Sequence, residues 1–364
     1  MAHKSLIGGT AYDITSGTSM VSGTTYNISG GRTLVDGTGY NISFTQPSTA
    51  MLYSDGSFVF QADDSVESGK TLTASYTDFE DISTPPWRGK QNKFTSVNFN
   101  TEIAPTSIAY WFNNARYMVA NISNFSNLNM NNVTTMYCTY NYCANLTGSP
   151  VCGNNVTTMY CTYFYCANLT GSPVCGNKVT TMRDTYYGCA NLTGSPVCGN
   201  NVTSMYRTYF GCYNLTGSPV CGNKVIDMSL TYCDCRNLTG SPVCSNNVTN
   251  MSYTYYGCRN LTGSPVCGNN VTDMSYTYYG CYNLNAGTFY FRAKNIANFR
   301  NCFYGKNNSR RYNIHVPTGS NTLNRIYNTT NTYSIVGQTI TWTNDGKNFY
   351  NTKYNIYIYA NSSL

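Results

Sequence analysis

The chain has 364 residues, of which 41% are hydrophobic and only 10% are charged, with a formal net charge of +7. Its aromatic content of 15% argues against a disordered chain, because disordered chains lack aromatic and apolar side chains. The positive charges form no run that would follow a phosphate backbone, so we expect no nucleic-acid partner. Residues 1–9 lack the apolar core of a secretion signal, and no apolar stretch could span a bilayer, so we expect no membrane insertion.

The first 42 residues contain a short repeat. Gly9, Gly23 and Gly37 lie 14 residues apart, and each is followed by a tyrosine three residues later. Each unit has two short apolar runs around a glycine-containing turn, which predicts a β-hairpin. Because isolated hairpins are only marginally stable in water, we interpret residues 1–44 as three hairpin repeats that attach the chain to a larger assembly. The alternative is an unstructured leader.

Residues 45–105 are β-rich and irregular. The segment from Tyr53 to Phe60 alternates apolar and polar residues around Asp55-Gly56, which is typical of a hairpin turn. Because the end of a repeat array needs a covering layer, we predict a β-rich cap here.

Seven copies of a 23-residue repeat follow, with the consensus V-T-x-M-x-x-T-Y-x-x-C-x-N-L-T-G-S-P-V-C-G-N-N. In the first copy, Met136, Tyr140 and Cys143 have the spacing of one face of a short helix, and Leu146 lies in an extended segment. The pattern predicts a repeat solenoid of leucine-rich-repeat type, with one short strand and one short helix per coil. The Val, Met, Tyr, Cys and Leu positions would form its buried ladders.

Other repeated positions predict how a coil turns. Proline cannot donate a hydrogen bond to a strand ladder, so we expect Ser149-Pro150 at a corner without pairing between coils. We expect Asn145 and its equivalents to point inward and bind a neighbouring turn. Degenerate copies extend the solenoid to residues 106–317. Residues 318–364 contain a turn signal at 344–346 and predict a β-hairpin cap.

The repeats resemble a known family. Residues 247–261, with Val248, Met251, Tyr255 and Cys258 in the repeated positions, are similar to the repeat of BspA-like leucine-rich repeat surface proteins. The resemblance covers about residues 86–306, although Gly-Ser-Pro replaces the family's Leu and Asp in the strand part. It implies a leucine-rich-type solenoid and a role in adhesion. Separately, residues 31–38 resemble the leaders of phage structural proteins.

The sequence offers no catalytic constellation. His3 and His315 are the only histidines, and neither lies near a carboxylate or cysteine at catalytic or metal-binding spacing. No P-loop, HExxH or GxSxG motif is present. We therefore expect neither enzymatic activity nor a cofactor or metal.

The 17 cysteines are the most chemically reactive feature of the sequence. Equivalent cysteines in adjacent coils would lie close enough for disulfides, but free cysteine is also a good small core residue. Both readings stay open, whereas the absence of CxxC spacing argues against metal. The candidate disulfide or thiol ladder comprises Cys138, Cys161, Cys143, Cys152, Cys166 and Cys175, and Cys138 and Cys161 are the best single pair for a bond between coils.

The positions that differ between repeats lie off the predicted core face. Positions 137, 138, 141, 142 and 144 and their equivalents vary while the core ladder is constant, and we expect all of them to point outward. Tyr and Arg are enriched at binding hot spots. The candidate recognition surface comprises Tyr137, Tyr160, Arg183, Tyr206, Arg207, Tyr253 and Tyr276. Neutral drift on a solvated face would produce the same variability.

Together these features predict a non-enzymatic recognition or adhesion protein. The leader favours a phage virion component, displayed on the virion surface, that contacts other virion proteins through residues 1–44 and a host cell-surface glycan or protein through the solenoid. The alternatives are a virion decoration protein without receptor binding and an adhesin on a bacterial cell surface. Homo-oligomerisation stays open.

Overall fold

The computed structural model describes residues 48–118, 122–284, 287–305, 309–327, 335–336, 340–345 and 348–364, together with the strand backbones between residues 4 and 40. The chain divides into two compact units, Met1–Pro47 and Ser48–Leu364. Each unit is described by itself.

The first unit contains three antiparallel strand pairs. β1 (Lys4–Ile7) pairs with β2 (Thr10–Asp13), β3 (Thr18–Val21) with β4 (Thr24–Asn27), and β5 (Thr33–Val35) with β6 (Thr38–Tyr40). Each pair spans one of the predicted 14-residue units. The glycines at the expected turns lie outside the described residues.

The second unit begins with a five-stranded sheet. Its strands are β7 (Thr49–Tyr53), β8 (Ser57–Gln61), β9 (Leu72–Tyr76), β10 (Ser96–Phe99) and β11 (Ile122–Ser123), in the order β11-β10-β8-β7-β9. β7 and β8 pair antiparallel around Asp55 and Gly56, where the sequence predicts a hairpin. β10 is parallel to β8 and to β11. Since β11 lies beyond residue 106, this sheet extends into the segment assigned to the solenoid.

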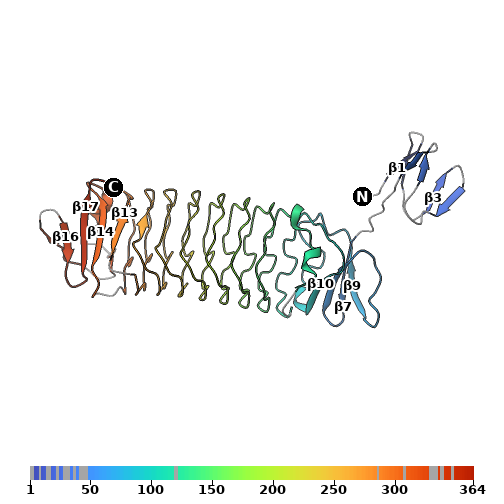
Figure 1. The fold of residues 1–364 in the computed structure, drawn as a ribbon, viewed down its shortest axis with the longest axis horizontal. Helices are drawn as coiled ribbons and strands as arrows, with labels where there is room; N and C mark the ends of the chain where they lie inside the picture. The colour runs from blue at the N-terminus through green and yellow to red at the C-terminus, as the bar shows by residue number, and fades with distance from the viewer. Residues whose placement is uncertain are drawn as a thin grey trace. The chain divides into compact units, whose positions relative to one another are not determined.

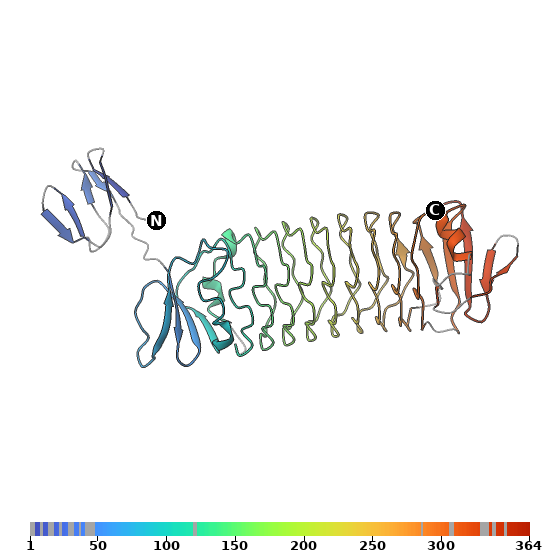
Figure 2. The same ribbon diagram turned by 180° about the vertical axis from the view of Figure 1, so that it is seen from behind.

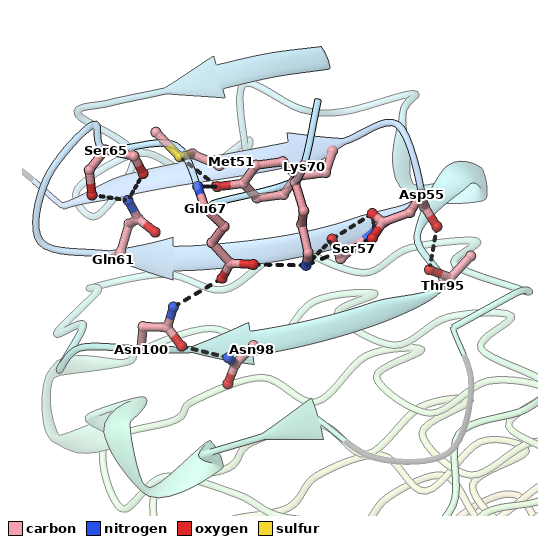
Figure 3. Close-up of polar contacts among 11 residues, drawn as sticks. Met51, Asp55, Ser57, Gln61, Ser65, Glu67, Lys70, Thr95, Asn98 and Asn100 are labelled. Atoms are coloured by element: carbon pink, nitrogen blue, oxygen red, sulfur yellow. Dashed lines mark hydrogen bonds and ion pairs between the residues drawn. The ribbon is translucent and has the colours of Figure 1, made fainter. Parts of the chain in front are cut away.

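The two faces of this sheet have different partners. Phe58 and Phe60 point into the main core, where the ring of Phe60 stacks on Trp111 with centroids 5.2 Å apart. Met51, Tyr53 and Val59 form a separate small cluster on the other face. Figure 3 shows the polar contacts on that side, where Lys70 lies 2.8 Å from Glu67 and 3.7 Å from Asp55. The backbone N–H of Glu67 also donates to the Tyr53 hydroxyl.

Short 3-10 turns connect the sheet to the first coils. They are η1 (Gln91–Lys93), η2 (Phe125–Asn127) and η3 (Met130–Asn132).

The repeats follow one another as a row of stacked coils (Figures 1 and 2). Parallel bridges link equivalent residues of successive coils, as in Thr135 to Thr158 and Thr158 to Thr181. The backbone N–H groups of Met136, Cys138, Tyr140 and Tyr142 all donate to carbonyl groups of the next coil at 2.7–3.1 Å. Adjacent coils are therefore joined directly through their backbones.

The short helix predicted in each coil is not present in the structure. Residues 136–143 form consecutive turns, in which Cys138 and Tyr142 have left-handed φ values of +52° and +58°. An α-helix would use every N–H within itself, whereas here alternate N–H groups bind the next coil. The spacing of Met136, Tyr140 and Cys143 still buries all three side chains, because the turns point them to the same side.

The coil interior contains a polar ladder as well as the apolar ones. The core tyrosines stack ring on ring with centroids 5.2–5.6 Å apart from Tyr140 to Tyr278. A fully buried threonine precedes each tyrosine, and its hydroxyl donates to a carbonyl of the preceding coil, which from Thr162 onward is that of methionine, as in Thr162 to Met136 at 2.8 Å. The core cysteine thiols also donate between coils, as in Cys166 to the Tyr140 carbonyl.

The Ser-Pro segments are linked to the next coil by tyrosine hydroxyl groups. The hydroxyl of Tyr209 accepts from the Val197 N–H at 3.0 Å and donates to the Val197 carbonyl at 2.8 Å. Tyr163, Tyr186 and Tyr232 bind Val151, Val174 and Val220 in the same way. A side chain thus supplies the pairing where proline prevents a strand ladder.

The asparagine two residues after each core cysteine points outward, so the predicted inward orientation is wrong, although Asn145 does bind the neighbouring coil as expected. Asn145 is exposed and donates to the carbonyl of Arg116, and Asn191 donates to the side chain of Asn168 at 3.3 Å. The polar side chain that points inward in each coil is instead the threonine before the core tyrosine. Its short hydroxyl reaches a carbonyl within the packed interior.

A six-stranded sheet covers the last coils. Its strands are β12 (Val266–Cys267), β13 (Thr288–Phe291), β14 (Tyr312–Pro317), β15 (Thr343–Asn344), β16 (Asn348–Asn351) and β17 (Ile356–Asn361), in the order β12-β13-β14-β17-β16-β15. The helix α1 (Asn321–Tyr327) packs beside β14.

The predicted C-terminal hairpin is only part of this sheet. β15, β16 and β17 pair antiparallel, but β12, β13, β14 and β17 are parallel. The parallel ladder begins where the next coil no longer has Ser-Pro, since the Tyr290 N–H donates directly to the carbonyl of Pro265. Without proline, the backbone can form the strand that the earlier coils lack.

The tyrosine bridge makes a testable prediction about stability. Tyr209→Phe leaves the N–H and C=O of Val197 without a partner, so we expect a loss of about 1–3 kcal/mol in the free energy of unfolding. Tyr278→Phe is the matched control, because the buried Tyr278 hydroxyl has no hydrogen-bond partner among the described residues. Its removal should be neutral. Equal losses in both variants, measured by urea denaturation, would contradict the bridge.

Candidate recognition surface

The candidate residues occupy the two positions that follow the core methionine of each coil. Tyr137, Tyr160, Arg183 and Tyr206 hold the first position, whereas Arg207, Tyr253 and Tyr276 hold the second. We call the side chains at these two positions the outer columns. They lie on the arc whose backbone pairs with the next coil, so each residue is close to its equivalent in the neighbouring coil.

The second outer column has an unfavourable backbone conformation in every coil. Its φ value is between +51° and +58° at Cys138, Cys161, Asp184, Arg207, Leu230, Tyr253 and Tyr276. This left-handed region costs about 1–2 kcal/mol for most residues with a Cβ and favours Gly, Asn or Asp. Of the seven residues only Asp184 is of these types. By contrast, four of the seven repeats use Gly at the other left-handed position of the coil, at Gly188, Gly211, Gly257 and Gly280.

Five of the seven predicted residues form one continuous cluster. The rings of Tyr137 and Tyr160 stack with centroids 4.9 Å apart. The guanidinium of Arg183 lies 5.6 Å from the ring of Tyr160 and 4.8 Å from that of Tyr206, and Arg207 lies 4.4 Å from Tyr206. We call these five residues the tyrosine–arginine cluster.

The other two predicted residues lie apart from this cluster. The rings of Tyr253 and Tyr276 stack with centroids 4.5 Å apart. The coil between the two groups has the buried Ser229 and the aliphatic Leu230 in its outer columns. The predicted surface is therefore divided into two aromatic patches.

Sequence reasoning missed a further aromatic column, five positions after the core methionine. Phe164, Tyr187 and Phe210 stack with centroids 4.7 and 4.6 Å apart. In the second patch, Tyr256, Tyr279 and Tyr304 stack at 4.6 and 4.8 Å. The 23-residue spacing of Phe164, Tyr187 and Phe210, and of Tyr256 and Tyr279, is the sequence signal for this column.

The prediction that all variable positions point outward is wrong in part. Five side chains at these positions are buried, namely those of Cys138, Asp184, Ser229, Cys233 and Ser275. The stacked rings are only partly exposed, since neighbouring rings cover their faces. What they present to solvent are ring edges and hydroxyl groups.

The two arginines of the tyrosine–arginine cluster are held in place by one carboxylate. The Asp184 carboxylate lies 3.3 Å from Arg183 and 3.4 Å from Arg207, and it is buried between them. Burial raises the pKa of Asp184, although the two guanidinium groups oppose this shift. Burial also raises the pKa of Tyr137 to about 12, so its hydroxyl remains a hydrogen-bond donor at neutral pH.

All 17 cysteines are thiols in the structure. Cys143 and Cys166 are fully buried in the core, and burial raises the pKa of both. Cys152 and Cys175 are partly exposed at the far corner of the coil, where burial raises the pKa of each to about 11. The described side chains include no group of three or more His, Cys, Asp or Glu that could hold a metal ion.

Cys138 and Cys161 lie together in the second outer column. Interaction with the Cys138 thiol lowers the pKa of Cys161. Interaction with the Cys161 thiol, together with burial, raises the pKa of Cys138. Cys161 is therefore the more acidic thiol of the pair.

This asymmetry predicts the order in which the cysteines react. With limiting iodoacetamide at neutral pH, we expect Cys161 to be alkylated about tenfold or more faster than Cys152 or Cys175, because the thiolate is the reactive form. Peptide mapping by mass spectrometry measures the rates. Cys138→Ala removes this interaction and should slow Cys161. Equal rates at Cys161 and Cys152 would contradict the lower pKa of Cys161.

Within the described ranges, no helix has the length and hydrophobicity that a membrane span requires. The model of one protein family, described as Mycoplasma protein of unknown function DUF285, matches residues 226–333. This match covers the last repeats and part of the parallel C-terminal sheet. No curated protein matches the chain. No solved structure matches it either.

Proposed function

We propose that this protein is a non-enzymatic recognition protein, a solenoid of leucine-rich-repeat type whose outer columns bind a cell-surface glycan. The proposal rests on the outer columns and not on the family match, which names no function. The similarity of the repeats to BspA-like surface proteins is consistent with such a role.

The observation that carries the proposal is the backbone conformation of the second outer column. A left-handed residue with a side chain is less stable than glycine at the same φ, yet no coil has glycine there, and only Asp184 is of a type that tolerates this region. Cys, Asp, Arg, Leu and Tyr all occur there, so no single packing contact explains the choice. Strained residues of this kind are concentrated at functional sites. We infer that this position carries side chains because the function of the protein needs them there.

The chemistry of the surface favours a glycan over a charged polymer. Tyr137, Tyr160 and Tyr206 present hydroxyl groups, and Arg183 presents a planar guanidinium with several N–H donors. Because adjacent coils repeat these groups along the stack, an extended chain of hydroxyl-rich units could hydrogen-bond to several coils at once. Asp184 already neutralises part of the positive charge.

The location of the protein is a separate proposal. We retain residues 1–44 as an attachment segment, but the comparisons provide no support for a phage particle, and recognition by the outer columns does not depend on it. A bacterial surface adhesin would use the same columns.

One observation favours a second function. The outer rings stack on one another from coil to coil, so they also stabilise the array. A purely structural decoration protein would need these contacts and no ligand.

A glycan array probed with the full chain distinguishes the two functions. We expect the double variant Tyr160→Ser and Tyr206→Ser to bind at least about tenfold more weakly than the wild type, because hot-spot tyrosines dominate binding energy. Serine is tolerated at this position, since Ser229, Ser252 and Ser275 occupy it in later coils.

The matched control is Tyr282→Ala, which removes an exposed tyrosine where Ala144, Ala167 and Ala190 stand in earlier coils. It should bind like the wild type. If the wild type binds no glycan, or if the double variant binds as well as the wild type, the recognition proposal is wrong and the structural function is favoured.

A further inference from the structure

The tyrosine–arginine cluster continues beyond the seven repeats toward the N-terminal cap. Tyr110, in the degenerate coil before the first repeat, has a φ of +62° and donates its backbone N–H to the carbonyl of Tyr137 at 3.0 Å. Cys138 pairs with Tyr160 in the same way at 2.9 Å, so Tyr110 holds the position of the second outer column. The rings of Tyr110 and Tyr137 have centroids 5.3 Å apart. The column of neighbouring rings is therefore one coil longer than the repeat indicates.

An arginine of the cap lies over the ring of Tyr110. The guanidinium of Arg88 is 4.3 Å from the centroid of this ring, and the Arg88 side chain is exposed. Among the described residues, no carboxylate forms an ion pair with Arg88. Arg88 thus adds a planar group with several N–H donors beside the first ring of the column.

Buried side chains fix the segment that carries Arg88. Trp87 is fully buried, and its indole N–H donates to the carbonyl of Trp111 at 2.8 Å. Gln91 is also buried and donates its side-chain amide to the carbonyl of Tyr110 at 3.0 Å. These two hydrogen bonds lie on either side of Arg88 in the sequence and both reach the coil that carries Tyr110. The position of Arg88 over the ring is therefore built into the fold.

We call Arg88, Tyr110 and the five residues of the tyrosine–arginine cluster the extended cluster. Its successive groups lie 5.3, 4.9, 5.6 and 4.8 Å apart, in the order Tyr110, Tyr137, Tyr160, Arg183 and Tyr206. The series stops after Arg207, because the next coil has the buried Ser229 and the aliphatic Leu230 in its outer columns. At the other end it stops at the cap. The extended cluster therefore has a defined length.

This length matches a short stretch of a linear glycan. Paired coils repeat every 4.8 Å or so, as in any parallel ladder, and an extended chain of sugar rings advances by a similar step per unit. We propose that the extended cluster is a site of fixed length, which binds about four or five successive sugar units with one unit beside each coil. The arginines donate to sugar hydroxyls, and the tyrosine hydroxyls donate and accept. This inference rests on the glycan recognition proposed above and adds where the site begins and ends.

Calorimetric titration of the full chain with a size series of oligosaccharides tests the length of the site. The series runs from disaccharide to decasaccharide and is prepared from the glycan that binds most tightly on the array. We expect the affinity to rise up to about the pentasaccharide and then to level off, because further sugar units lie beyond the extended cluster.

Two variants remove the cap end of the site. Arg88→Gln removes the guanidinium, and Tyr110→Leu introduces the residue that Leu230 supplies at the same left-handed position. Each should weaken binding of the hexasaccharide about tenfold and leave the disaccharide unchanged, because a disaccharide can occupy the other coils. The matched control is Arg116→Gln, which removes an exposed arginine 5.5 Å from the ring of Tyr142, outside the extended cluster. It should bind every oligosaccharide like the wild type.

The titrations separate a failure of this site from a failure of glycan recognition. If the chain binds no glycan, both proposals are wrong. The site of fixed length alone is overturned if a glycan binds but its affinity is independent of length or still rises up to the decasaccharide. It is also overturned if Arg88→Gln and Tyr110→Leu both bind the hexasaccharide like the wild type, or if Arg116→Gln loses as much affinity as they do.

Discussion

The structure depends on one constraint, which is that every coil must hydrogen-bond to the next without a continuous strand ladder. Proline in the Ser-Pro segment prevents such a ladder, so side chains supply part of the pairing. The hydroxyl of Tyr209 binds both backbone groups of Val197, and the buried Thr208 hydroxyl donates to the Met182 carbonyl at 2.9 Å. The Tyr, Thr, Met and Val positions are therefore linked, and a change at one leaves a partner unsatisfied in another coil.

The same constraint explains where the sequence is free to change. Changing a side chain in the outer columns does not disturb the backbone pairing, because the N–H of Cys138 and of its equivalents donates to the next coil whatever the side chain is. The columns can therefore hold Tyr in one coil and Arg in the next.

Much of the interior could be predicted from the repeat, but the local backbone could not. Met136, Tyr140 and Cys143 are buried as predicted, because burial follows from which positions stay apolar. The same spacing fits a helix or consecutive turns, and only the bonds to the next coil favour turns. The burial of Thr139 could not be predicted, because threonine is usually exposed. Its hydroxyl can be buried only because it donates to a carbonyl in another coil. The sequence predicted the residues of the tyrosine–arginine cluster and Tyr253 as one surface, whereas their separation depends on the coil between them.

Native-state hydrogen exchange of the valine amides tests the pairing between coils most directly. If the tyrosine hydroxyls replace a strand ladder, the N–H groups of Val174, Val197 and Val220 should exchange as slowly as the interior N–H groups of Tyr186 and Tyr209. Exchange of the valine amides at the rate of an exposed turn, while Tyr186 and Tyr209 stay protected, would contradict this account.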